Sequence, residues 1–108
     1  MGFLSKFFGN GISLNVEIAN AISNGAVLLD VRSVAEFKSG SVPGAINIPV
    51  DNITTQFNKI KGKESVVVFC RSGNRSRIAK SILLELGIKN VIDGGTWQSV
   101  NQIISKSN

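Results

Sequence analysis

The chain has 108 residues, of which 43% are hydrophobic and 18% are charged, and its formal net charge is +5. This length suits one domain, and the composition excludes an intrinsically disordered chain, because disorder requires low hydrophobicity together with high charge. Basic residues are spread along the sequence and gather only at Arg71, Arg75 and Arg77. Since nucleic-acid binding usually shows clustered basic residues with interleaved aromatics, the pattern favours a small anion as ligand and no nucleic acid.

The chain contains one cysteine, Cys70, and no histidine. A single cysteine forms no internal disulfide, and a chain without histidine has neither a mixed Cys/His metal site nor the usual general base of a cysteine protease. We therefore expect no metal and no cofactor. A free thiol fits a reducing compartment, so we expect a cytoplasmic protein.

Residues 1–12 are expected to form an N-terminal arm, followed by a single domain over 13–108. The apolar residues of the arm are interrupted by Ser5 and Lys6, which argues against a signal peptide, and the stretch is too short to span a bilayer. Two interpretations remain open, an arm that packs on the domain or a turn that touches a membrane or partner. We favour packing, and expect no membrane contact, because the arm carries one positive charge for anionic lipids.

In chain order, the predicted strands alternate with the predicted helices, which indicates an α/β fold with a central, mainly parallel sheet flanked by helices. Ser13 is the predicted N-cap of a first helix, and Gly25 is the predicted left-handed residue after it. Ser33 and Glu36 have the spacing of a capping box at the start of a second helix. The predicted helices are 14–22, 33–38, 52–60 capped by Asp51, 76–86, and a last one ending near 104; the predicted strands are 26–31, 45–50, 66–69 and 91–92, with a turn at 94–95.

Cys70 follows the most apolar predicted strand and precedes a helix, with the sequence Arg-Ser-Gly-Asn-Arg between them. Backbone N–H groups at a helix N-terminus lack intrahelical partners, and the helix dipole adds positive charge there. These groups, with the nearby arginines, favour thiolate over thiol. The competing interpretation is an unreactive thiol in the core. Such a thiol would not need a basic, glycine-containing turn at the start of a helix, so we predict that Cys70 is a nucleophile.

The candidate site follows from this loop. Cys70 is the predicted nucleophile, and Arg75 is the candidate for neutralising the donor or the leaving anion, whereas Arg71 is expected to point outward. Asp30, Arg32 and Glu36 are expected to support the site through a hydrogen-bonded or ionic network, because an ionised nucleophile needs no carboxylate base. The predicted substrate-binding residues are Arg71, Ser72, Gly73, Asn74 and Arg75.

Several motifs occur in order: Leu-Asp-Val-Arg at 29–32, Val-Pro-Gly-Ala-Ile-Asn-Ile-Pro at 42–49, Cys-Arg-Ser-Gly-Asn-Arg-Ser at 70–76, and Gly-Gly before Trp97. Together they resemble a single-domain rhodanese (thiosulfate sulfurtransferase) module over about residues 27–97. The resemblance implies a three-layer domain with a central parallel sheet. It also implies a cysteine that accepts sulfane sulfur from a donor and holds it as a persulfide.

The resemblance implies a sulfurtransferase enzyme of the thiosulfate:cyanide type. The donor would be a small sulfur-containing anion, thiosulfate or a persulfide, and the acceptor a thiol, cyanide or a thioredoxin-like protein. A non-catalytic sulfur carrier or partner-binding module is the alternative. The related phosphatases and arsenate reductases use a loop one residue longer than 70–75, so the loop length favours sulfur over a tetrahedral oxyanion.

Overall fold

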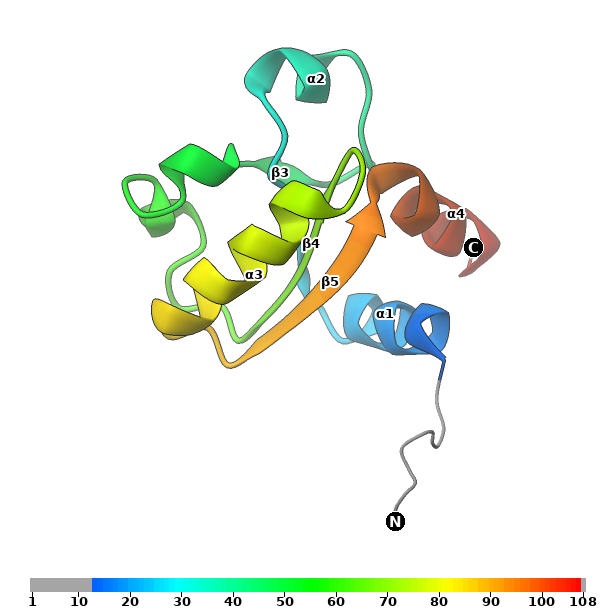
Figure 1. The fold of residues 1–108 in the computed structure, drawn as a ribbon. Helices are drawn as coiled ribbons and strands as arrows, with labels where there is room; N and C mark the ends of the chain where they lie inside the picture. Colours follow the sequence, from blue (N-terminus) through cyan, green and yellow to red (C-terminus); the bar gives the residue numbers. More distant parts are fainter. Residues whose placement is uncertain (1–12, 108) are drawn as a thin grey trace.

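The computed structural model describes residues 13–107 and, over this range, shows a four-stranded parallel sheet in the order β3–β2–β4–β5. The expected α/β fold with a parallel sheet is confirmed (Figure 1). The arm predicted over residues 1–12 lies outside the described residues. The strands are β2 (Val27–Asp30), β3 (Ile46–Asn47), β4 (Ser65–Cys70) and β5 (Asn90–Thr96).

Helices cover both faces of the sheet, as the α/β pattern requires. α3 packs on β4 and β5 from one side, while α1 and α4 contact each other on the other side (Figure 1). The short α2 lies beyond the carboxyl end of the strands. Within residues 13–107, none of the helices has the length and apolar character needed to cross a membrane. The helices are α1 (Leu14–Ser23), α2 (Val34–Lys38), α3 (Asn74–Glu85) and α4 (Trp97–Ser107).

The predicted caps of α1 and α2 are confirmed, whereas α3 begins at Asn74, two residues before its predicted start at 76, with Gly73 at the N-cap position. The side chain of Ser13 accepts the N–H of Val16 at 3.2 Å at the start of α1. Ser33 and Glu36 form the complete capping box of α2. Gly25, with φ of 90°, follows the end of α1 in the left-handed conformation that favours glycine.

β4 places its side chains alternately on the two faces of the sheet, as the period of two in a strand requires. Val66, Val68 and Cys70 belong to the core between the sheet and α3. Val67 and Phe69 belong to the core under α1 and α4. The sulfur of Cys70 therefore points to the α3 side, at the carboxyl edge of the sheet.

β5 is longer than predicted, because it continues through the two glycines that were expected to form a turn. The pairing with β4 shifts between Val68 and Cys70, so β5 carries one extra residue there, as a β-bulge does. Gly95 has φ of 77°, which the bulge requires. At Gly94, a Cβ atom would lie 2.7 Å from Cγ2 of Val100, so the close approach of α4 requires a glycine.

The helix predicted over 52–60 is wrong, because the segment forms two short 3₁₀ helices, η1 (Val50–Asn52) and η2 (Phe57–Lys59), with turns between them. The predicted cap Asp51 lies inside η1, and the capping position is occupied by Pro49 without a side-chain hydrogen bond. β-Branched residues at 53–55 have low helix propensity, which explains the break. The strand predicted over 45–50 is limited to β3, the edge of the sheet, because proline at 49 donates no ladder hydrogen bond.

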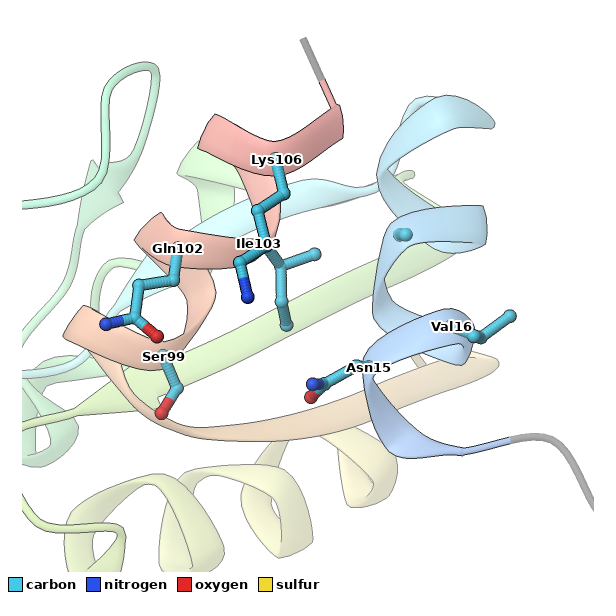
Figure 2. A pocket seen from close by; sticks show the side chains of 7 residues that line it. Asn15, Val16, Ser99, Gln102, Ile103 and Lys106 are labelled. Atoms are coloured by element: carbon cyan, nitrogen blue, oxygen red, sulfur yellow. The ribbon is translucent and has the colours of Figure 1, made fainter.

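A hollow of about 260 Å³ lies between α1 and α4. Figure 2 shows Asn15 of α1 facing Ser99, Gln102 and Lys106 of α4, with Ile103 between the two helices. This hollow lies on the face of the sheet opposite to α3. It is therefore separate from Cys70, whose side chain belongs to the α3 side.

Candidate active site

Cys70 ends β4 with its side chain fully buried, and two backbone N–H groups point at its sulfur. The N–H of Gly73 donates to Sγ at 3.0 Å, and the N–H of Ser76 donates to it at 3.3 Å. Gly73 occupies the N-cap of α3 with φ of 93°, a left-handed conformation that turns its N–H inward. The loop between β4 and α3 lies at the same end of the sheet as α2 (Figure 1). It forms a cradle for a negatively charged sulfur.

Hydrogen bonding lowers the pKa of the Cys70 thiol below its ordinary value, although burial alone would raise it. The bonds that lower this pKa come from the side chain and backbone of Ser76 and from the backbone N–H groups of Gly73 and Ser72. The Ser76 hydroxyl donates to the carbonyl of Gly73 at 3.1 Å, and it can rotate to the nearby sulfur instead. These hydrogen bonds stabilise the charged form of Cys70 relative to the thiol.

Ser76 is a further candidate site residue, which lies just outside the predicted loop 70–75. Its side chain is fully buried, and both its backbone and its hydroxyl act on Cys70. The available signal was its place in the first turn of α3, where backbone N–H groups have no intrahelical acceptor.

The side chains of the other loop residues lie away from the sulfur. Arg71 and Ser72 are exposed, and the Asn74 side chain accepts a hydrogen bond from Arg77 at 2.8 Å. Ser72 acts on Cys70 through its backbone N–H. The loop therefore surrounds the sulfur with main-chain groups and presents its polar side chains to solvent.

Glu36 and Arg75 form a two-pronged ion pair that joins α2 to α3. Nη1 of Arg75 lies 2.7 Å from Oε1 of Glu36, and Nη2 lies 3.0 Å from Oε2. These hydrogen bonds, with the backbone of Ser33, lower the pKa of the Glu36 carboxyl to about 2. Glu36 raises the pKa of Arg75, and the charge of Cys70 adds to this effect. Both members of the pair are therefore ionised beside the sulfur.

Asp30 and Arg32 form a second, buried ion pair. Nη2 of Arg32 lies 2.7 Å from Oδ2 of Asp30 and donates to the carbonyl of Gly40 at 2.6 Å. The hydroxyl of Ser41 donates to Asp30 at 2.6 Å, and the guanidinium lies 5.1 Å from the ring centre of Trp97. This cluster attaches the segment after α2 to β2 and α4. The structure thus divides the three predicted supporting residues between two ion pairs.

Across residues 13–107, the His, Cys, Asp and Glu side chains form no group of three that could hold a metal ion. Cys70 is instead surrounded by main-chain donors and lies near the ion pair of Glu36 and Arg75.

The model of the rhodanese-like domain family matches residues 15–98. A protein named as a putative mitochondrial thiosulfate sulfurtransferase of Schizosaccharomyces pombe is 40% identical over an alignment of 85 residues, and the match covers 66% of this chain and 60% of that protein. The thiosulfate sulfurtransferase GlpE of Pseudomonas savastanoi pv. phaseolicola is 34% identical over an alignment of 73 residues, and the match covers 66% of this chain and 69% of GlpE. The solved structure described as rhodanese with anions from E. coli is 32% identical to this chain and superposes on it with a TM-score of 0.61. The match covers 69% of this chain and 91% of that one. The chain thus spans less than two thirds of the fission yeast relative.

Proposed function

The chain belongs to the rhodanese-like domain family, and we propose that it is a sulfurtransferase that carries sulfane sulfur as a persulfide on Cys70. The observation that best supports this proposal is the buried sulfur with N–H donors from Gly73 and Ser76 and a lowered pKa. Relatives named as sulfurtransferases support sulfur transfer in general. The free thiol suits a reducing compartment, and we propose the cytoplasm.

The first half-reaction loads the cysteine. The Cys70 thiolate attacks the outer sulfur of thiosulfate or of a persulfide and forms a new S–S bond. The S–S bond of the donor breaks, and sulfite or a thiolate leaves with the electron pair. The main-chain N–H groups of the loop 71–75 and of Ser76 then stabilise the negative charge on the terminal sulfur, as an oxyanion hole stabilises oxygen.

The second half-reaction unloads it. A nucleophilic acceptor, such as cyanide, a small thiol or a cysteine of a thioredoxin-like protein, attacks the terminal sulfur. The bond between the two sulfurs breaks, and Cys70 is released as a thiolate ready for the next donor. We expect the exposed Arg71 to steer anionic donors or to contact a protein acceptor.

Intact-mass spectrometry tests the loading step directly. The wild type is incubated with thiosulfate or with the persulfide of a small thiol, and the Cys70→Ser variant is treated in the same way. We expect one added sulfur on the wild type and none on the variant. Absence of an adduct with every sulfane donor, in a folded protein whose thiol is free, would contradict the proposal.

A carrier that receives sulfur from another enzyme, without turning over a small donor itself, is the alternative. A coupled assay with cyanide separates the two, because an enzyme produces thiocyanate in many-fold excess over protein while a carrier stops after one equivalent. The phosphatase alternative is tested by release of phosphate from an aryl phosphate, which should depend on Cys70 if that chemistry operates.

A further inference from the structure

The ion pair between Glu36 and Arg75 determines the charge that a donor meets near Cys70. Both prongs of the Arg75 guanidinium are bound to the Glu36 carboxylate, at 2.7 and 3.0 Å. Arg75, whose charge interacts with that of Cys70, is therefore already neutralised by an acid from another element. With the Cys70 thiolate included, these three groups have a net charge of −1 rather than 0.

The two proposed donor classes differ in charge. Thiosulfate is a dianion, whereas the persulfide of a small neutral thiol carries at most one negative charge. The electrostatic energy between a donor and a charged group is proportional to the charge of the donor. A negative group near Cys70 therefore repels the thiosulfate dianion twice as strongly as it repels a monoanion. Arg71 and Arg77 are exposed, so solvent and salt screen their charges more than those of the half-buried Glu36 and Arg75.

On this basis, and resting on the proposed function above, we propose that Glu36 selects the sulfur donor by holding the charge of Arg75, so that the site accepts a thiol-bound persulfide in preference to thiosulfate. The accepted step is attack of the Cys70 thiolate on the outer sulfur of R–S–SH. Its S–S bond breaks, the thiol R–SH leaves with the proton, and the Cys70 persulfide anion remains.

The alternative arrangement, in which Arg75 is free to bind the donor, would require Glu36 to leave it. The geometry opposes this, because Glu36 is also held by its own helix. Oε1 of Glu36 accepts the N–H of Ser33 at 3.1 Å and its hydroxyl at 3.0 Å, within the capping box of α2. Releasing Arg75 by turning Glu36 away would also open that box.

The Glu36→Gln variant tests the selection with little disturbance, because glutamine keeps the capping box and removes one negative charge. Stopped-flow rates of Cys70 persulfide formation are measured with thiosulfate and with the persulfide of 2-mercaptoethanol. Each rate is divided by the alkylation rate of Cys70 with iodoacetamide, a neutral reagent that reports the amount of thiolate. Glu85→Gln is the matched control, since it makes the same charge change at the far end of α3.

After this normalisation, Glu36→Gln should accelerate thiosulfate by about tenfold at low salt and the persulfide by about threefold or less. The acceleration should shrink at high salt, and Glu85→Gln should change neither rate. Equal acceleration of both donors, or no preference for the persulfide in the wild type, would overturn the selection by Glu36. Failure of the wild type to take sulfur from either donor is a different result, and it would remove the proposed function itself.

Discussion

Gly73 provides the sharpest test of how the loop acts on the sulfur. Its N–H lies 3.0 Å from Sγ of Cys70, and this position depends on a φ of 93°. A Cβ atom added to Gly73 would meet nothing within 4 Å. The Gly73→Ala variant therefore introduces backbone strain without a steric clash.

Gly73→Ala should lower both the stability of the fold and the thiolate population of Cys70. An L-residue in the left-handed region costs about 1–2 kcal/mol, and the lower entropy of alanine in the unfolded chain offsets part of this, leaving about 1 kcal/mol. For a chain of 108 residues, this corresponds to a fall of about 4 °C in the melting temperature. Relief of the strain turns the Gly73 N–H away from the sulfur. Losing this hydrogen bond to the charged sulfur raises the pKa of Cys70. At a pH below that pKa, the fraction of Cys70 present as thiolate falls about tenfold.

The assay is the pH dependence of Cys70 alkylation by iodoacetamide, together with thermal unfolding. In the wild type, the rate should reach its plateau below the pH of an ordinary thiol, because the folded protein lowers the pKa of Cys70. In Gly73→Ala, the profile should move to higher pH. Gly25→Ala is the matched control, since Gly25 has φ of 90° and equally open surroundings at the end of α1.

Both variants should therefore lose similar stability, and Gly73→Ala alone should change the alkylation profile. If Gly73→Ala melts lower but titrates like the wild type, the N–H of Gly73 does not stabilise the thiolate. If Gly25→Ala moves the profile as well, the shift reflects general loosening of the fold rather than the loop.

Three further predictions concern stability. Gly94→Ala should lose about 1–3 kcal/mol in urea unfolding, because its Cβ would lie 2.7 Å from Val100; an unchanged midpoint would contradict this packing. Asp30→Ala should cost about 3–5 kcal/mol in the same experiment, since it leaves the Arg32 guanidinium buried and unpaired, and a loss below about 1 kcal/mol would show that water reaches Arg32. Folding lowers the pKa of Glu36 from 4.5 to about 2, so its ionisation stabilises the protein fully above pH 4.5 and loses this effect as the pH falls to 2. The stability difference between wild type and Glu36→Gln should shrink over that pH range, and a constant difference would argue against the pair.

The sequence predicts the parts of this fold that short-range patterns determine. The continuous apolar run at 66–69 indicated the central strand, and the caps at Ser13 and Ser33 indicated helix starts that the structure confirms. The short β3 and the two 3₁₀ helices depend on packing against neighbours and on long-range hydrogen bonds, such as that from the N–H of Val50 to the carbonyl of Val31, just after β2. Such contacts leave no local periodicity.

The same distinction holds at the candidate site. Cys70 and its loop were identified because strand, glycine-bearing turn and helix follow each other in sequence. The partner of Arg75 was not identified, because Glu36 lies 39 positions earlier and meets it only through the placement of α2 beside α3. Ser76 was missed because its N–H and hydroxyl act only once the first turn of α3 brings them back to the sulfur.

An isotope-chase experiment shows whether sulfur passes through Cys70. The protein is loaded from a persulfide donor whose outer sulfur is isotopically labelled, separated from the donor, and then treated with cyanide. We predict one labelled sulfur on the peptide that contains Cys70 before the chase, and the same label in thiocyanate afterwards. Label that reaches thiocyanate without ever residing on Cys70, or equal transfer by Cys70→Ser, would show that sulfur does not pass through Cys70.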